Sequence, residues 1–269
     1  MRSLIKSICV VFTVATLACG TPGAVFAANI VQNGQFTSNT GYGWVGQNFG
    51  QGTTSVSVSN WNNAVAPSFG GPALTWLFNG NTPTQSVNFN GTVMGLQGGV
   101  TANPGGGNFL ALDGDPQYNA KFSQSITGLT VGNTYQLSFD YAGAQQTGFS
   151  GPQQVTSYLN VTFGSDSQNT QTLVRANSTN GSDGVFTGWS VVTMDFTASA
   201  ANQTLAFLAI GTPGGLPPIA LLGDVSLMDT TPEPPAPPVP EPSSIFMTAI
   251  GFASLVAVRY RRRMNSTKA

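Results

Sequence analysis

The sequence lacks histidine altogether and has almost no cysteine. Among 269 residues there is no histidine, and both cysteines, Cys9 and Cys19, lie within the first nineteen positions. Ser-His-Asp catalysis, Cys-His catalysis and Cys/His zinc sites are therefore excluded. Once an N-terminal segment containing both cysteines is removed, no disulfide can form. The fold must then be held by its core and its hydrogen bonds alone.

Charge is also scarce, and it is unevenly distributed. Charged residues make up 7% of the chain, against about 25% in a typical soluble domain. Between the basic residues at the two ends only Lys121 and Arg175 are basic, and eight aspartates stand against them. A region with this negative balance repels phosphate backbones, which excludes a nucleic-acid partner.

Residues 1–27 have the three parts of a secretory signal peptide. Two basic residues are followed by an apolar stretch and then by small residues that end at Ala27. This order predicts export by the Sec machinery, with cleavage between Ala27 and Ala28. A retained membrane anchor and a lipoprotein attached through Cys19 remain as alternatives, and each of them also leads out of the cytoplasm.

The C-terminal part of the chain has a different composition. Residues 230–242 contain seven prolines in thirteen positions, which predicts an extended stalk because proline fixes φ and removes a hydrogen-bond donor. Residues 243–258 are uncharged and mostly apolar, and at 1.5 Å per residue they span about 24 Å, less than the roughly 30 Å hydrocarbon core. The segment 243–269 therefore predicts one short transmembrane helix, inserted transiently, with a basic cytoplasmic tail.

These C-terminal features together resemble the PEP-CTERM sorting signal of Gram-negative bacteria. The resemblance implies recognition by an exosortase, a membrane cysteine protease-transpeptidase that acts near a Pro-Glu-Pro motif, and a place at the outer surface or in the exopolysaccharide or biofilm matrix. An ordinary tail anchor after a proline-rich linker is the alternative. The residues that would carry the signal are Val239, Pro240, Glu241, Pro242, Arg259, Arg261, Arg262 and Arg263.

The central region, residues 28–229, has the alternation of β-strands. From Tyr135 to Tyr141 every odd position is apolar or aromatic and every even position is polar, which is typical of a half-buried strand. Similar patterns predict strands at 55–59, 157–163, 192–197, 204–210 and 224–228. Gly-, Asn- and Pro-rich turns separate them, so we predict an all-β fold, one antiparallel β-sandwich.

Three stretches resemble the galactose-binding-like jelly rolls of exported bacterial proteins, which include carbohydrate-binding modules and the DUF642-like group. The stretch 30–36, with Trp44 shortly after it, resembles their opening strand. Residues 124–135 resemble their central hairpin, and residues 221–227 resemble their final strand. An acidic residue often follows the opening Asn-Gly-x-Phe in that group, and this chain has Thr37 there.

Asp113-Gly114-Asp115 is a candidate metal-binding turn. Two carboxylates around a glycine can be presented to one Ca²⁺ together with backbone carbonyls, and Asp224 would add a third if the terminal strands adjoin. The alternative is a plain Asp-Gly turn, in which the carboxylate bonds its own backbone. The sequence gives no other cofactor.

Aromatic side chains are the second kind of candidate site. Trp61 is flanked by asparagines, Tyr118 stands in Pro116-Gln117-Tyr118-Asn119, and Trp44 lies in a Gly-rich stretch. Exposed rings of this kind stack on sugars while amides bind the hydroxyls. Burial of these rings in the core is the alternative.

We therefore expect a non-enzymatic exported protein of the cell surface or matrix. A lectin-like carbohydrate-binding module, with or without Ca²⁺, is the first alternative. A secreted glycoside hydrolase with paired aspartates is a remote one, since such a pair must face each other across about 5 to 9.5 Å.

Overall fold

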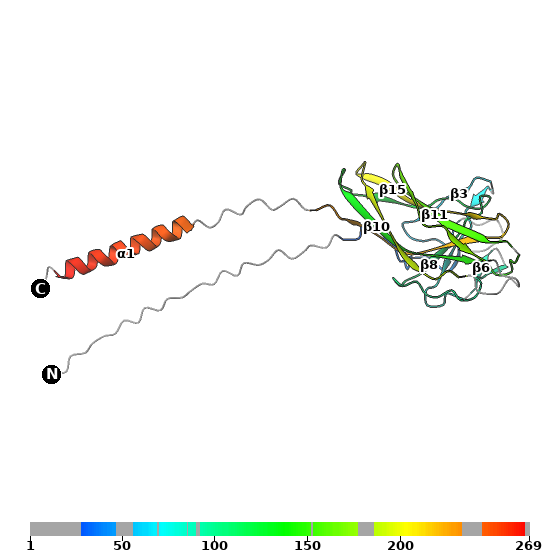
Figure 1. The fold of residues 1–269 in the computed structure, drawn as a ribbon, viewed down its shortest axis with the longest axis horizontal. Helices are drawn as coiled ribbons and strands as arrows, with labels where there is room; N and C mark the ends of the chain where they lie inside the picture. Colours follow the sequence, from blue (N-terminus) through cyan, green and yellow to red (C-terminus); the bar gives the residue numbers. More distant parts are fainter. Residues whose placement is uncertain are drawn as a thin grey trace, which may run out of the picture. The chain divides into compact units, whose positions relative to one another are not determined.

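The computed structural model describes residues 28–46, 56–68, 70–84, 86–89, 92–151, 153–176, 186–232 and 244–266. The chain divides into two compact units, Met1–Asp229 and Thr230–Ala269. Figure 1 shows strands in the first unit and one helix in the second. The predicted signal peptide, including Ala27, and the predicted motif from Val239 to Pro242 lie outside the described residues.

Sixteen strands and one helix make up the secondary structure of the described residues. The elements are β1 (Gly43–Trp44), β2 (Asn62–Asn63), β3 (Val65–Ala66), β4 (Gly71–Pro72), β5 (Thr75–Phe78), β6 (Val87–Phe89), β7 (Thr92–Met94), β8 (Phe109–Asp113), β9 (Phe122–Thr127), β10 (Thr134–Gln145), β11 (Val155–Phe163), β12 (Asp166–Asn169), β13 (Leu173–Arg175), β14 (Ser190–Thr197), β15 (Asn202–Thr212), β16 (Pro218–Asp229) and α1 (Ser244–Ser266).

Two sheets form an antiparallel β-sandwich, as the alternation predicted. The larger sheet has eight strands in the order β14-β10-β16-β8-β5-β1-β6-β7, and only β1 and β6 are parallel. The smaller sheet has the order β12-β11-β15-β9-β2, with β13 added alongside β11. The strands β3 and β4 form a separate two-stranded ribbon. The predicted all-β fold class is confirmed.

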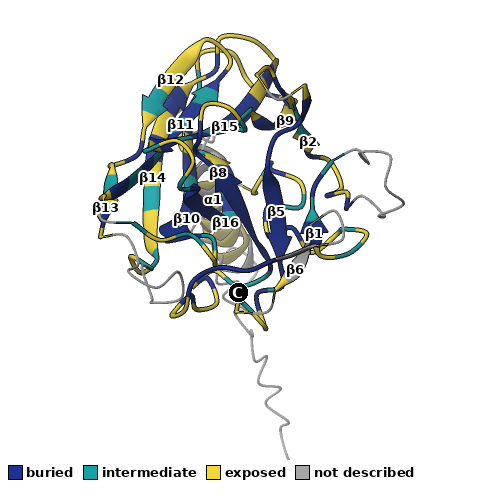
Figure 2. Cartoon of the chain, turned by 90° about the vertical axis from the view of Figure 1, so that its right-hand side faces the viewer, coloured by how far each residue is buried: buried dark blue, intermediate teal, exposed yellow. Residues whose placement is uncertain are grey.

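The main core lies between the two sheets. It is formed by the apolar residues that alternate with polar residues along the strands. Tyr135, Leu137, Phe139 and Tyr141 of β10 all point into it, and the alternating residues of β11 face them from the other sheet. Successive side chains of a strand point to opposite faces, so one apolar set is enough to fill this layer. Figure 2 shows the inner strands as buried, in dark blue, with β12 and β14 carrying more exposed residues.

A second hydrophobic cluster covers the other face of the larger sheet. Its buried members come from β5, β7, β8, β10 and β16, from the residue before β5 and from the segment that follows β7. They are Leu74, Trp76, Phe78, Met94, Leu96, Val100, Phe109, Ala111, Ala142, Ala144, Ile219 and Leu221. Trp44, Tyr118, Phe186 and Trp189 pack against it and stay half-buried. This face of the sheet is therefore a second core.

The larger sheet closes on itself around this second cluster. The strand β14 pairs only with residues 134–141 of β10. Beyond it, Gly143 of β10 exchanges hydrogen bonds with Thr187, and the edge at Gln145 is left for another segment. The chain leaving β7 returns to that edge, where the Gln97 N–H donates to the Gln145 carbonyl at 2.8 Å and the Thr147 N–H donates to the Gly95 carbonyl at 2.9 Å. The larger sheet and the segment after β7 thereby surround the apolar second cluster on the face that points away from the smaller sheet.

The predicted strand at 55–59 is not a regular strand where it is described. Val56 and Val58 make only isolated bridges, with Val45 and with Asn39. The opening stretch instead pairs with the end of the chain's last strand, since the Ile30 N–H donates to the Leu227 carbonyl at 3.0 Å. Gly34 lies so close to β16 that an added Cβ would stand 1.9 Å from the Val225 carbonyl oxygen.

Candidate functional site

An uncharged groove lies beside Trp61 at the edge of the smaller sheet. Its volume is about 580 Å³, and the described residues that line it are Val45, Gly46, Val56, Ser57, Val58, Trp61, Asn62, Asn63, Ala64, Val65 and Pro72. The Asn63 side chain is committed, because its Nδ2 donates to the carbonyls of Val45 and Ala73 and its Oδ1 accepts from Thr75. The exposed amide of Asn62 remains available to a ligand.

Trp61 itself belongs mainly to the core. Its side chain is 9% exposed, stacks on Phe122 with ring centroids 5.1 Å apart, and meets Phe36 edge-on at 5.5 Å. Its Nε1 donates to the Asn33 carbonyl at 3.2 Å. The expectation of an exposed sugar-stacking ring is thus corrected: the ring faces are packed, and only a small part of the side chain borders the groove.

Trp44 and Tyr118 lie elsewhere, against the second cluster. Both are half-buried, and neither is among the described residues of the Trp61 groove. Trp44 stands opposite Trp76 and donates its Nε1 hydrogen to the Ala73 carbonyl at 3.1 Å. The Tyr118 carbonyl accepts from the Leu74 N–H at 3.0 Å. The three predicted aromatic residues therefore do not form one site.

Asp113 and Asp115 form a self-bonded turn at the end of β8. The Asp115 N–H donates to Asp113 Oδ1 at 2.9 Å, while Asp115 accepts the N–H groups of Gln117 at 2.9 Å and Gly215 at 2.6 Å. Three of the four carboxylate oxygens are thus occupied by backbone donors. This is the plain Asp turn that the sequence left as the alternative to a Ca²⁺ site.

The Asp113 carboxyl has a strongly shifted acidity. Burial raises the pKa of Asp113 from 3.8 to about 7, the hydrogen bond from the Asp115 N–H opposes the shift, and the Asp115 charge adds to it. The side chain is only 2% exposed and points to the same face of β8 as the apolar second cluster. Desolvation favours the neutral acid there, so this group keeps its proton to a much higher pH than an exposed aspartate does.

Asp224 does not join that turn. The strands β8 and β16 are adjacent, but Asp113 stands opposite Ile219, five residues before Asp224. At about 3.3 Å per residue the two carboxylates are roughly 16 Å apart along the sheet. The expected approach of Asp224 to Asp113 and Asp115 is therefore wrong, because the register places them at opposite ends of the paired segment.

Asp224 instead lies near Asp140, across an irregularity in the pairing of β10 with β16. The Gly105 N–H donates to Asp140 Oδ2 at 2.8 Å, and Gln35 Nε2 donates to Asp224 Oδ1 at 3.1 Å. Burial raises the pKa of Asp140; hydrogen bonds from Gly105 and Asn103 lower it, and the Asp224 charge raises it further.

Asp140 and Asp224 are a second pair of neighbouring carboxylates. Calcium takes six to eight oxygen ligands, so carbonyl and amide oxygens would have to supply most of them. Within the part of the chain that the structure describes, no three His, Cys, Asp or Glu side chains gather into a group that could hold a metal ion.

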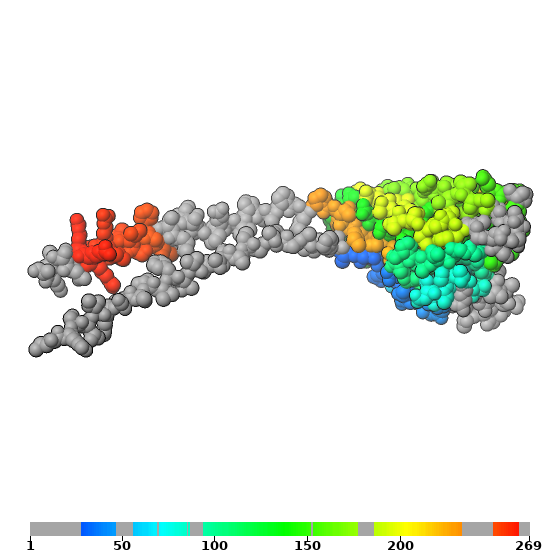
Figure 3. All heavy atoms as spheres, turned by 60° about the horizontal axis from the view of Figure 1, so that its bottom comes forward, coloured from blue at the N-terminus to red at the C-terminus, as the bar shows by residue number. Residues whose placement is uncertain are grey.

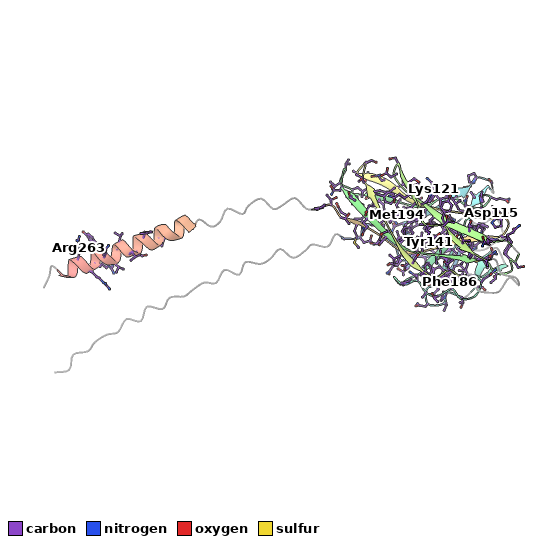
Figure 4. The ribbon with its side chains drawn as sticks, in the orientation of Figure 1. Asp115, Lys121, Tyr141, Phe186, Met194 and Arg263 are labelled. Atoms are coloured by element: carbon purple, nitrogen blue, oxygen red, sulfur yellow. The ribbon has the colours of Figure 1, made fainter. Side chains whose placement is uncertain are left out.

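The four predicted sorting arginines lie in the last third of α1. Arg259, Arg261, Arg262 and Arg263 are exposed, as are the apolar side chains of Phe252, Leu255 and Val256 earlier in the helix. Figure 4 labels Arg263 on this helix. Within the described part of the chain, no helix is both long enough and apolar enough to span a bilayer.

Two buried polar residues were not predicted as site residues. Arg175 donates to the carbonyls of Ala144 at 2.6 Å and Ile219 at 3.2 Å, and burial lowers its pKa to about 10. Gln145 is completely buried, and among the described residues neither the nitrogen nor the oxygen of its amide has a hydrogen-bond partner. The rarity of basic residues could have marked Arg175, since the central region has only one other, Lys121.

Comparison with known proteins gives only distant likeness. No family model matches the chain, and no curated protein matches it. Among solved structures, TmCBM61 in complex with β-1,4-galactotriose is 11% identical, with a TM-score of 0.36, over 76% of this chain and 99% of its own.

Two further solved structures show likeness of similar size. The N-terminal cellulose-binding domain of Cellulomonas fimi β-1,4-glucanase C is 19% identical, with a TM-score of 0.28, over 52% of this chain and 85% of its own. The arabinose-bound α-L-arabinofuranosidase MgGH51 is 13% identical, with a TM-score of 0.38, over 77% of this chain and 27% of its own. Likeness of this size leaves the ligand and activity of this chain to be argued from its own residues.

Proposed function

We propose that this chain is an exported, non-enzymatic protein of the cell surface or extracellular matrix, sorted by an exosortase-type system. The observation that carries the proposal is the order of parts at the C-terminus. A Pro-Glu-Pro motif at residues 240–242 is followed at once by α1, whose apolar part precedes four arginines. This tail belongs to a different compact unit from the sandwich.

The composition and the geometry of the acids support a non-catalytic role. The chain has no histidine, and the carboxylates of Asp113 and Asp115 accept hydrogen bonds from backbone N–H groups, including that of Gly215. Paired-carboxylate hydrolysis needs two acids that flank a substrate bond. We therefore keep the glycoside hydrolase only as the remote alternative.

The partners in this proposal follow from the two ends of the chain. The Sec machinery would export the chain and remove residues 1–27, and the exosortase would act near Glu241. An apolar run of sixteen residues, 243–258, is shorter than the hydrocarbon core of a bilayer. It would suit a segment that enters the inner membrane of a Gram-negative cell briefly before the processed protein leaves.

Intact-mass measurement of the native protein, with cell fractionation, tests the sorting proposal. We expect mature material that begins near Ala28 and lacks the residues after the 240–242 motif. Glu241→Ala should leave full-length chain in the membrane fraction. The earlier Pro232-Glu233-Pro234 copy offers a matched control, since Glu233→Ala should leave processing unchanged. Mature protein that still carries residues 243–269 would replace the sorting signal with a simple tail anchor.

Carbohydrate binding is the second candidate function, and the groove beside Trp61 favours it. The groove is uncharged, is of a size suited to small ligands, and offers the free amide of Asn62 beside apolar walls. Asn62→Ala tests it without disturbing the core, because this side chain is exposed. If the Asn62→Ala variant retains neutral oligosaccharides as strongly as the unchanged protein does, the groove is not the binding site.

A further inference from the structure

The outer face of the smaller sheet carries a row of small side chains at right angles to its strands. Asn62 pairs with Ser123, Ser123 with Ala206, Ala206 with Thr162, and Thr162 with Ser167. Directly opposed residues of neighbouring strands point to the same face, and Phe122, Phe163 and Phe207 beside them point inward. The row therefore runs across five strands, β2, β9, β15, β11 and β12, on the outer face.

The polar groups of this row are available to a partner. Asn62, Ser123 and Thr162 make no side-chain hydrogen bond to any residue that the structure describes. In the adjacent row Asn160 donates its Nδ2 hydrogens to Ser167 Oγ and Asn169 Oδ1, both at 2.8 Å. These bonds hold the Asn160 amide in place and leave its Oδ1 to accept from outside.

Apolar side chains border the polar row on the same face. Leu208 stands opposite Asn160, and Ile210 stands opposite Tyr158, so these side chains continue the outward pattern of β15 and β11. All are half-buried. The face thus places hydroxyl and amide groups beside aliphatic and aromatic surface, the combination that suits a sugar, with its polar edges and its apolar ring faces. Figure 3 shows the yellow-green segments that include β11 and β15 as a continuous stretch of surface.

Among the residues that the structure describes, no aspartate projects from this face, although the central region has a net negative charge. Asp113 and Asp115 are buried in their turn, and Asp140 and Asp224 belong to the larger sheet. Asp166 in β12 stands opposite the inward-facing Phe163 and so does not project from the outer row. The negative charge of the domain would repel an anionic polymer, and no cluster of cations among the described residues offsets that repulsion here. A neutral polymer would not be repelled, and its hydroxyls could bond to the uncharged polar groups of the face.

We infer that the outer face of the smaller sheet binds a neutral, extended polysaccharide that lies across its strands. Neighbouring strands are about 4.8 Å apart, a distance close to the length of one sugar unit in an extended chain. Successive sugars therefore lie over successive strands, with hydroxyls on Asn62, Ser123, Thr162 and Ser167 and ring faces on Leu208, Ile210 and Tyr158. Ala206 of β15, which is only 2% exposed, offers no polar group between Ser123 and Thr162. The inference deepens the carbohydrate-binding candidate and does not depend on the sorting signal.

Native affinity electrophoresis of the full chain in mild detergent tests this inference. The gels contain hydroxyethylcellulose, β-1,4-galactan or dextran as neutral polymers, and polygalacturonate as the anionic one. We expect retardation by at least one neutral polymer and not by polygalacturonate. The double variant Ser123→Glu/Thr162→Glu places two charges in the centre of the row and should weaken that retardation at least about tenfold.

The matched control places the same change on the other sheet. Thr193→Glu/Thr197→Glu alters two exposed threonines of β14 and should leave retardation within twofold of that of the unchanged protein. Thermal unfolding confirms that both double variants are folded.

Equal retardation of the two double variants overturns the inference. Any sugar site would then lie in the groove beside Trp61, and Asn62→Ala would test it there. Absence of retardation by every neutral polymer overturns it too, while intact-mass analysis still decides the sorting proposal. A third outcome is that sedimentation shows a dimer of the unchanged protein and a monomer of the Ser123→Glu/Thr162→Glu variant, while retardation by the polymers is the same for both. The face would then be a self-association surface, and the inference would be overturned.

Discussion

The two outer faces of the sandwich differ in what covers them. On the larger sheet, the chain's own residues cover the outer face around β5, β8 and the adjoining ends of β10 and β16: Leu96, Val100 and Trp189 pack over Phe109 and Leu221. The outward side chains of β14, among them Thr193 and Thr197, stay exposed. On the smaller sheet, the outer face is bordered by half-buried Tyr158 and Leu208 and carries polar groups without partners in the described chain. The part of a sheet face that is already filled cannot receive a ligand, so the smaller sheet is the better candidate for a binding surface.

Strand length explains why the two faces differ. The strands β10 and β16 each have twelve residues, and they extend beyond β14, which has eight. The uncovered end of β10 gives the segment after β7 an edge to pair with, and this pairing draws apolar side chains over the sheet. The corresponding edges of the smaller sheet end in the short strands β12, β13 and β2.

The largest effect is expected for Trp61, whose ring joins the core to the groove. Trp61→Ala removes the stack on Phe122 and the contact with Phe36, and we expect it to lower the free energy of unfolding by about 3 to 5 kcal/mol. Urea unfolding measures this. Trp61→Phe keeps an aromatic ring and should cost clearly less. A cost below about 1 kcal/mol for Trp61→Ala would show that the ring is an exposed platform after all.

The alternation in the sequence was enough to predict the sandwich and its inner core. Tyr135, Leu137 and Phe139 alternate with polar residues, and all three face the other sheet. The second core was missed because the alternation stops after Tyr141: from there to Ala144 the residues are small, and both faces of the strand are buried. Two-sided burial removes the polar set that makes a strand recognisable.

The candidate site was harder to predict, because the pairing register of the strands determines which side chains lie close together. The sequence predicts a turn at Asp113 and a strand that begins at Asp224, but only the pairing of β8 with β16 shows that the two residues are far apart. The row from Asn62 to Ser167 draws on five strands separated by up to 105 positions. No local pattern connects such residues, since pairing register depends on the whole core.

Two consecutive leucines of β16 allow the stability contributions of the two cores to be compared in one strand. Leu221 points into the second cluster and Leu222 into the core between the sheets, and both are fully buried. We expect Leu221→Ala and Leu222→Ala each to cost about 2 to 5 kcal/mol in urea unfolding. If Leu221→Ala costs less than a third of Leu222→Ala, the larger sheet's outer face is not a packed core, and the contrast between the faces is lost.

Asp113 gives the second cluster a dependence on pH. Its pKa is about 7 in the folded protein and about 3.8 in the unfolded chain, so the folded state retains a proton between those values while the unfolded state has lost it. Stability therefore falls as pH rises through that window, by up to about 1.4 kcal/mol per pH unit, and levels off above pH 7. Asp113→Asn should remove this slope and raise stability at pH 8 by about 1 to 4 kcal/mol.

Unfolding curves at pH 3.5, 5.5 and 8 separate this effect from a packing change. At pH 3.5 the original acid is protonated in the folded state, so the two proteins should have similar stability there. The amide oxygen of the introduced Asn can still accept the Asp115 N–H that the carboxylate accepts now. An equal difference between the two proteins at all three pH values would mean that Asp113 does not titrate in this window.

The smallest effect is expected on the open face itself. Thr162 is half-buried and makes no side-chain hydrogen bond to a described residue, and Thr193 is exposed in β14. Single changes of either threonine to glutamate should shift the free energy of unfolding by no more than about 0.5 kcal/mol, as for most surface substitutions. Thermal unfolding in parallel measures both. If Thr162→Glu costs more than three times this amount while Thr193→Glu does not, the outer face of the smaller sheet is covered in solution, and the two sheets are alike.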